Sequence, residues 1–150
     1  MFKALVIALA TLMVAPAAAQ TLVDGTNPER ISQLIRGFGT AEVSKDNEGD
    51  PKITGAIGVA RYLVLFFGCT DGANCRDIAF YSTIDNPAVT FEQLNKFNDD
   101  NRFGTAYRLD AETVVVKMPV NLFKGVTEES FLDTVDWWRI VLDKFREAAS

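Results

Sequence analysis

The spacing of apolar positions predicts three helices in this chain. Apolar residues recur at helical intervals after Asn27, Thr90 and Thr127, and each of these residues has a side-chain oxygen that can cap a helix N-terminus. Glu128 and Glu129 follow the last cap, where carboxylates favour the helix dipole. The last helix has the longest apolar stripe, which consists of Phe131, Val135, Trp138, Leu142 and Phe145.

Short apolar runs bounded by turn-forming residues predict six strands. They cover residues 41–45, 52–57, 62–67, 76–84, 103–109 and 113–122. The third run is apolar on both alternating sets, which predicts a central strand covered on both faces. Tight links between successive strands favour antiparallel pairing. The predicted fold class is therefore α+β, with three helices packed on an antiparallel β-sheet.

Glycine and proline mark irregular places in this pattern. Pro119 lacks an N–H group, which predicts an edge position or a bulge in the last strand. Gly55 and Gly58 predict a bend or a bulge before the strand at residues 62–67. Residues 20–26 show neither the helical spacing nor the strand alternation of apolar positions, and they are predicted to be a short leader to the domain.

Residues 1–19 are predicted to be a signal peptide. Lys3 precedes an apolar run from residue 4 to residue 14, and Pro16 separates that run from Ala17-Ala18-Ala19. Cleavage after Ala19 leaves one periplasmic domain, residues 20–150, without a transmembrane segment. An uncleaved anchor is the weaker alternative, because a membrane span needs about 20 apolar residues.

Cys69 and Cys75 are predicted to form a structural disulfide. They lie at the end of one strand and the start of the next, and the export signal places them in an oxidising compartment. A redox couple is less favoured, because the C-x-x-C spacing and a helix N-terminus that lowers a thiol pKa are both missing.

The composition excludes several classes of chemistry. The chain has no histidine, which excludes Ser-His-Asp and Cys-His catalysis and the usual zinc sites. Its net charge is −5, and the acidic residues are spread along the chain, so nucleic acid is not an expected partner. We expect no cofactor and no metal, because Asp46, Glu48 and Asp50 fit a solvated turn and not the register of an EF-hand.

A set of residues from the middle of the chain to its end is similar to the YbjN family of bacterial proteins, described as sensory-transduction regulators. In chain order the set is Asp46, Gly49-Asp50-Pro51-Lys52-Ile53, Phe66-Phe67-Gly68-Cys69, Cys75, Ile78, Phe80-Tyr81, Leu94-Asn95, Asn98, Arg102-Phe103-Gly104, Val120-Asn121-Leu122, Gly125-Val126 and Trp137-Trp138. The resemblance covers about residues 28–147. It implies a fold like that of type III secretion chaperones, which dimerise and offer a groove to a partner polypeptide. It supplies no catalytic residues.

The functional expectation is therefore an exported, non-enzymatic YbjN-like domain that binds a protein partner as an adaptor or chaperone, with a link to sensory or stress regulation. A homodimer is left open. The expected contact residues are Trp137, Phe123, Asn95, Asn98 and Arg102. One alternative is a histidine-free envelope hydrolase that uses a carboxylate such as Asp99 or Asp100. The other is a structural envelope protein.

Overall fold

The computed structural model describes residues 21–150, and the predicted signal peptide lies outside this range. The fold is α+β, as predicted. The helices are α1 (Pro28–Ile35), α2 (Phe91–Asp100) and α3 (Glu128–Ala148). The strands are β1 (Leu22–Val23), β2 (Thr40–Lys45), β3 (Pro51–Ile57), β4 (Ala60–Phe67), β5 (Asp77–Asp85), β6 (Thr105–Arg108), β7 (Thr113–Asn121) and β8 (Val126–Thr127).

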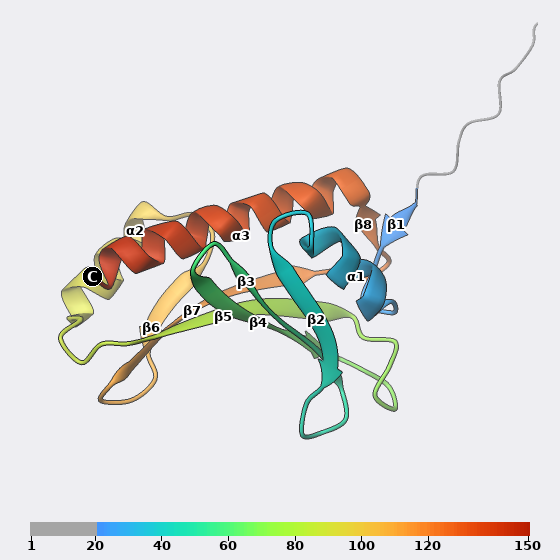
Figure 1. Cartoon of the computed structure of the whole chain (residues 1–150), viewed down its shortest axis with the longest axis horizontal. Helices are drawn as coiled ribbons and strands as arrows, with labels where there is room; N and C mark the ends of the chain where they lie inside the picture. The colour runs from blue at the N-terminus through green and yellow to red at the C-terminus, as the bar shows by residue number, and fades with distance from the viewer. Residues whose placement is uncertain (1–20) are drawn as a thin grey trace, which may run out of the picture.

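Six strands form one antiparallel sheet in the order β2-β3-β4-β5-β7-β6. The sheet arches, and all three helices lie on the same side of it (Figure 1). The N-caps of the helices are the expected ones, because the side chains of Asn27, Thr90 and Thr127 each accept a hydrogen bond from a backbone N–H in the first turn.

The hydrophobic core lies between the sheet and α3. Trp138 is fully buried, and its ring centroid is 5.3 Å from that of Phe80 on β5. The other members of the predicted α3 stripe are also buried. Burial of each large apolar side chain stabilises the fold by roughly 1.5–3 kcal/mol, so α3 is held mainly by this one face.

The second face of the sheet is open, and this corrects the expectation for β4. Tyr62, Val64 and Phe66 are buried under the helices. On the opposite face, Leu63 and Leu65 are half-buried and Phe67 is 41% exposed. Strand alternation separates two faces but does not say which of them receives helices. Because all three helices lie on one side, the prediction that β4 is covered on both faces is wrong.

Pro119 lies at a local edge of the sheet, as predicted, although β7 is an inner strand. In an antiparallel ladder, every second residue of β7 hydrogen-bonds to β5. Leu122 belongs to the bonded set, because its N–H donates to Arg76 O. Pro119 lies an odd number of residues away and therefore directs its backbone away from β5. The neighbour on that side, β6, pairs only as far as Lys117. The missing N–H of Pro119 therefore costs no ladder hydrogen bond. The register is continuous and contains no bulge.

The glycine predictions hold in part. Gly58 has a φ of 58° and forms the turn between β3 and β4, which is the expected bend. Gly55 is not at a bulge, because the β2–β3 and β3–β4 registers run through it without a break. A side chain at Gly55 would run into the backbone carbonyl of Thr40, which accepts a hydrogen bond from the Tyr62 hydroxyl at 2.7 Å.

The segment before α1 is part of the fold and not a free leader. Leu22 and Val23 pair with β8, directly before α3. Val23 is buried with 1% exposure, and a side chain at Gly25 would collide with the backbone of Cys75. Two residues are too few for a recognisable strand pattern, so this pairing was not predicted.

Candidate functional site

Two of the predicted contact residues lie in one surface cluster, which we call the Trp137 cluster. It consists of Trp137 on α3 and of Arg102 and Phe103, which follow α2. The rings of Phe103 and Trp137 are 4.9 Å apart between centroids, and the Arg102 guanidinium carbon lies 5.4 Å from the Phe103 ring centre. Trp137 is half-buried and Phe103 is 39% exposed. The cluster presents two aromatic rings in contact, tilted by 50° to each other, beside a positive charge.

The predicted contact residue Phe123 forms a second cluster of the same chemistry, which we call the Phe123 cluster. Phe123 is 52% exposed and lies between β7 and β8. The guanidinium carbon of Arg76 lies 4.4 Å from the centre of its ring, and the Lys124 ammonium lies 5.6 Å from it. Both distances are within the range of a cation–π interaction.

The cations of both clusters have no acidic partner in the part of the chain that the structure describes. The ion pairs of residues 21–150 involve other basic side chains, which are Arg30, Lys96, Arg139 and Lys144. The two clusters therefore offer uncompensated positive charge next to exposed rings, although the chain as a whole has a net charge of −5.

The two asparagines of the predicted set have different surroundings. Asn95 is exposed on α2. The amide of Asn98 donates to Ala106 O at 2.9 Å, and its carbonyl oxygen accepts from Ala106 N at 2.7 Å. Ala106 belongs to the edge strand β6, so the amide of Asn98 is already occupied by this strand.

Sequence reasoning missed three members of these clusters, namely Phe103, Arg76 and Lys124. A signal was present for two of them. Phe103 and Lys124 are each a direct neighbour of a selected residue, and an aromatic beside a basic residue at the end of a predicted strand indicates surface exposure. Arg76 is brought to Phe123 by the β5–β7 pairing, which places Arg76 opposite Leu122, and only the fold reveals it.

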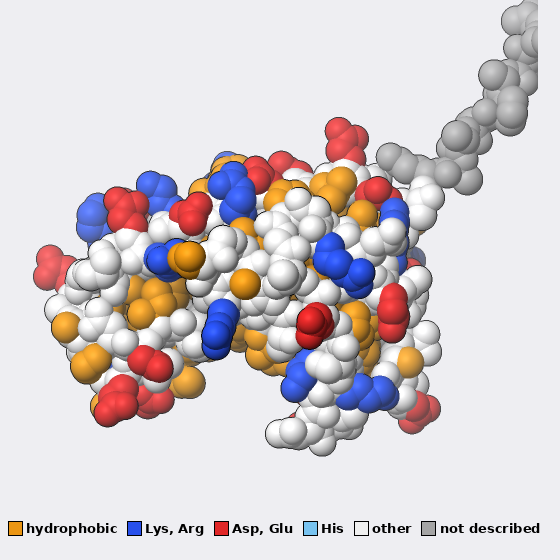
Figure 2. Space-filling model, viewed as in Figure 1, with side chains coloured by type: hydrophobic (Ala, Val, Ile, Leu, Met, Phe, Trp, Pro, Cys, Tyr) orange, Lys and Arg blue, Asp and Glu red, His pale blue; other side chains and the backbone are white. Residues whose placement is uncertain are grey.

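The open face of the sheet carries a hollow of about 450 Å³. Phe67, Ala79 and Pro119 supply its apolar lining, and Asp77 and Lys117 supply charges. In the space-filling view the surface is notched on the side away from the helices, between the ends of the β2–β3 and β6–β7 hairpins (Figure 2). This apolar face follows from the one-sided packing of β4.

The carboxylates of the hydrolase alternative lie near a hollow between α2 and α3, of about 350 Å³. Asp100 lines it and accepts a hydrogen bond from Lys96 at 2.7 Å, which raises the pKa of the Lys96 ammonium. Glu147 also lines it and lies 3.7 Å from Lys144. Asp99 does not line it. Each carboxylate of this hollow thus has a lysine partner, whereas a glycosidase pair needs one protonated and one free carboxyl group.

The acidic turn at residues 46–50 is held by its own backbone. The Asp46 carboxylate accepts hydrogen bonds from Glu48 N at 2.9 Å and from Asp50 N at 3.0 Å. This geometry is that of an Asx turn. Within residues 21–150, no group of three or more potential metal-ligating acidic or cysteine side chains comes together.

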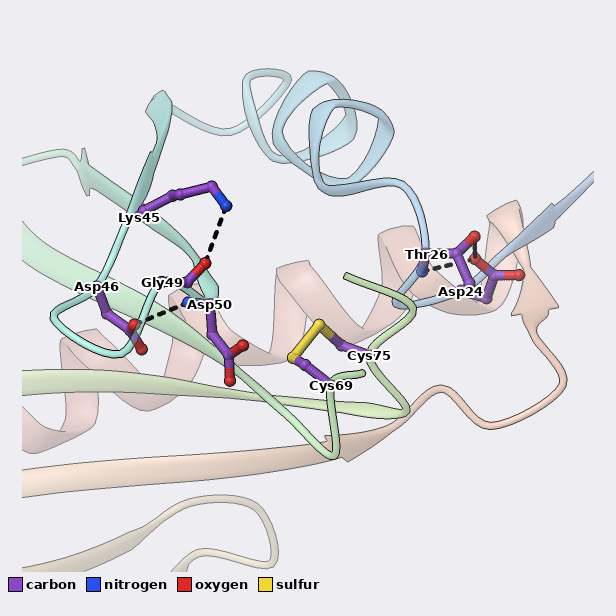
Figure 3. Close-up of a disulfide and its surroundings, with 8 residues drawn as sticks. All are labelled: Asp24, Thr26, Lys45, Asp46, Gly49, Asp50, Cys69 and Cys75. Carbon is purple, nitrogen blue, oxygen red and sulfur yellow. Dashed lines mark hydrogen bonds between the residues drawn. A yellow bond between two sulfur atoms is a disulfide. The ribbon is translucent and has the colours of Figure 1, made fainter. Parts of the chain in front are cut away.

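Cys69 and Cys75 form the predicted disulfide, next to the β2–β3 turn (Figure 3). Cys75 is buried and packs against Gly25, while residues 70–74 form a loop with Asp71 and Asn74 in left-handed conformations. The disulfide therefore closes this loop, and one end of the loop lies against Gly25 of the N-terminal segment. No helix in the described range is long and apolar enough to cross a membrane.

The comparisons with known proteins agree with this fold. Residues 27–150 match the model of the YbjN family, described as "Putative bacterial sensory transduction regulator". The structure is similar to a crystal structure from E. coli, "YbjN, a putative transcription regulator", with a TM-score of 0.56 and 14% identity over 81% of this chain and 92% of that chain. No curated protein matches the chain.

The structural likeness shows a shared fold, and the family description names a regulator and not an enzyme. The family model spans nearly all of the residues from α1 to the end of α3, including both aromatic clusters. The chain therefore belongs to the YbjN family.

Proposed function

We propose that the protein is an exported, non-enzymatic adaptor that binds a partner polypeptide through the Trp137 and Phe123 clusters. The observation that carries this proposal is the repeated combination of an exposed aromatic ring with a cation that has no acidic partner in residues 21–150. Aromatic residues and arginine are the side chains most enriched at energetically important interface positions.

The charges and aromatic rings of the two clusters indicate what kind of partner surface would bind them. A surface that presents carboxylates beside apolar side chains would pair its charges with Arg102, Arg76 and Lys124 and cover the rings of Phe103 and Phe123. Opposite charges also speed association. The disulfide supports export, because disulfides form and persist in oxidising compartments.

Site-specific photo-crosslinking in the producing bacterium tests this function. We would introduce the photoreactive residue benzoylphenylalanine at Phe103 and at Phe123, and irradiate intact cells. Both positions are expected to give a covalent adduct with the same partner protein, because both rings would lie in the interface.

Phe91 provides the matched control, since it is an exposed phenylalanine on α2 with no cation from residues 21–150 over its ring. Crosslinking there should not give the adduct. Charge reversal of Arg102 or Arg76 to glutamate should reduce its yield. The proposal fails if Phe91 gives the same adduct as the cluster positions, or if neither cluster gives one.

A further inference from the structure

The two edges of the six-stranded sheet differ in whether their outward-facing backbone groups have hydrogen-bond partners. At the β6 edge, Leu109 belongs to the residues that hydrogen-bond to β7, because its N–H donates to Thr113 O. Every second residue of an antiparallel strand points the other way. Ala106 therefore directs its N–H and C=O outward, away from β7. Both groups are taken by the Asn98 amide, as described above. The exposed end of β7 beyond β6 is blunted by Pro119, which has no N–H to offer. These are two ways in which proteins prevent pairing at a sheet edge.

The β2 edge is open at Val43 and Lys45. The hydrogen bond from Asp46 N to Asp50 O continues the β2–β3 ladder, and its alternation directs the backbone groups of residues 41, 43 and 45 away from β3. Ala41 O is closed by Ser32 Oγ at 3.0 Å and by Arg36 Nε at 3.2 Å. For Val43 and Lys45, no backbone partner exists among residues 21–150.

Charged side chains often guard an open edge, but Lys45 does not point along this one. Its ammonium donates to Gly49 O at 3.0 Å and is thereby folded onto the β2–β3 turn (Figure 3). The backbone of Val43 and Lys45 is therefore accessible to another strand.

A hollow of about 340 Å³ adjoins this open edge. It is bounded by Val43, Lys45 and Pro51 of the hairpin, by Thr26 and Pro28 before α1, and by Ala73 of the disulfide loop. Its exposed lining is mostly apolar. In a strand added to β2, alternate side chains point toward the helix side of the sheet, so one of them would enter this hollow.

We propose that the β2 edge is a strand-addition site for an extended segment of a partner polypeptide. The segment pairs with the N–H and C=O groups of Val43 and Lys45 and places one apolar side chain in the hollow between β2, the N-terminal segment and the disulfide loop. This inference extends the proposed adaptor function to a second site, apart from the Trp137 and Phe123 clusters, and states the conformation in which a polypeptide binds there.

A second copy of the chain fits this edge less well than an extended peptide. The open stretch is limited by the closed Ala41 carbonyl on one side and by the Asp46–Asp50 turn on the other. Two copies joined over so short a ladder would bury far less than the roughly 1,200 Å² of a specific dimer interface. A flexible segment can instead follow the edge and enter the hollow.

Selection of peptides on the protein purified after export tests the site. The probe is a displayed library of random peptides of about twelve residues, and a selected peptide is then titrated into the ¹⁵N-labelled protein. We expect amide shifts at Val43, Lys45 and Ala73. We also expect Val43→Pro to weaken binding about tenfold or more, because it removes the outward N–H but no β2–β3 hydrogen bond.

Val43→Thr is the matched control, since it keeps the N–H and the branched side chain, and it should change the affinity less than about threefold. Ala73→Phe is a second variant that fills the hollow and leaves β2 unchanged, and it should also weaken binding. It decides the question if Val43→Pro fails to fold by circular dichroism.

Four outcomes would overturn the inference. Shifts confined to the Trp137 and Phe123 clusters would place the peptide elsewhere and leave the adaptor function standing. A dimer in analytical ultracentrifugation that Val43→Pro converts to a monomer would show that the edge joins two copies. Selected peptides that bind Val43→Pro and Ala73→Phe as tightly as the unchanged protein would exclude strand addition. Absence of both peptide binding and crosslinks would reject both proposals.

Discussion

Asn98 takes the place of a missing neighbouring strand. Its amide matches the N–H and C=O of Ala106 as a paired strand would, with both distances below 3 Å. A side chain that satisfies two backbone groups at once contributes stability through both hydrogen bonds, and its loss leaves two partly buried groups without partners. The role of this residue is therefore at least partly structural.

We expect Asn98→Ala to lower the free energy of unfolding by about 1–2 kcal/mol. Chemical denaturation followed by tryptophan fluorescence would measure it. Asn95→Ala is the control on the same helix, and because Asn95 is exposed, its effect should stay within about 0.5 kcal/mol. Equal effects of the two substitutions would contradict the strand-closing role.

Tyr62 is a buried phenol that links β4 to the first residue of β2 across β3. Its hydroxyl donates to Thr40 O at 2.7 Å, and burial raises the pKa of the Tyr62 hydroxyl well above its ordinary value of 10.0. The folded state thus holds this proton more tightly than the unfolded chain. The stability that depends on the neutral phenol is complete below about pH 10 and is lost as the pH rises above it.

Tyr62→Phe should therefore make the stability less sensitive to pH above about 10, although the variant loses the hydrogen bond to Thr40 at every pH. Urea denaturation between pH 8 and 11 would show this. Tyr107→Phe serves as the control, because Tyr107 is 38% exposed, and it should retain the original pH dependence. An unchanged slope for Tyr62→Phe would refute the interpretation.

Among the elements, α3 has two faces with different roles, since one packs in the core and the other lies at the surface. Trp138 is fully buried against Phe80, whereas Trp137 contacts the ring of Phe103 at the surface. Adjacent helical positions point about 100° apart. One helix can therefore anchor the core with one residue and present a binding surface with the next.

Truncation of the two tryptophans should separate these duties. Trp138→Ala is expected to cost about 3–5 kcal/mol of stability, because it leaves a cavity in the core. Trp137→Ala should cost roughly 0.5–1.5 kcal/mol and should abolish the crosslink at Phe103. Thermal unfolding and the crosslinking assay measure the two effects. Similar losses of stability in both variants would argue against the division.

The disulfide constrains the connection between β4 and β5. It closes a short loop that contacts both Gly25 and the β2–β3 turn, since a side chain at Gly72 would meet Gly49 O. The loop also borders the hollow next to β2. The disulfide therefore restricts the conformations of the unfolded chain, and in the folded protein it holds the loop that borders this hollow.

Replacing Cys69 and Cys75 together by alanine should reduce the stability by about 2 kcal/mol on the loop-entropy model. The melting temperature of the unchanged protein should fall similarly in a thiol reductant, while the double variant should show no response to the reductant. A reductant effect of the same size in the double variant would mean that the disulfide is not the cause.

For the whole molecule, the predicted export signal bears on which form of the chain folds. The described fold begins with β1 at Leu22, only a few residues after the predicted cut. Val23 is buried and paired with β8, so cleavage far beyond this point would remove a part of the fold.

We expect the mature protein in the periplasmic fraction to begin at Gln20, which intact-mass spectrometry would detect together with the loss of two hydrogens for the disulfide. Replacing Ala17 and Ala19 by bulky residues should block the cut and retain the precursor at the membrane. A cytoplasmic protein with its first residues intact would overturn the export prediction.

Local signals in the amino-acid sequence specify the class of the fold and most of its elements, because apolar periodicity and N-cap residues act over a few neighbouring positions. The helices after Asn27, Thr90 and Thr127 and the disulfide between Cys69 and Cys75 needed no knowledge of distant contacts. The likeness to the YbjN family came from residues in order along the chain. Local signals of this kind predict the fold class, but they do not predict which faces and edges of the sheet are covered.

Contacts between distant parts of the chain specify which surfaces are free. The open face of β4, the pairing of β1 with β8, the approach of Arg76 to Phe123 and the unpaired edge at Val43 each depend on segments far apart in the chain. Strand alternation is the same whichever face a helix covers, and a backbone group is the same whether or not a neighbour pairs with it. The candidate binding surfaces are therefore products of packing, which no local pattern records.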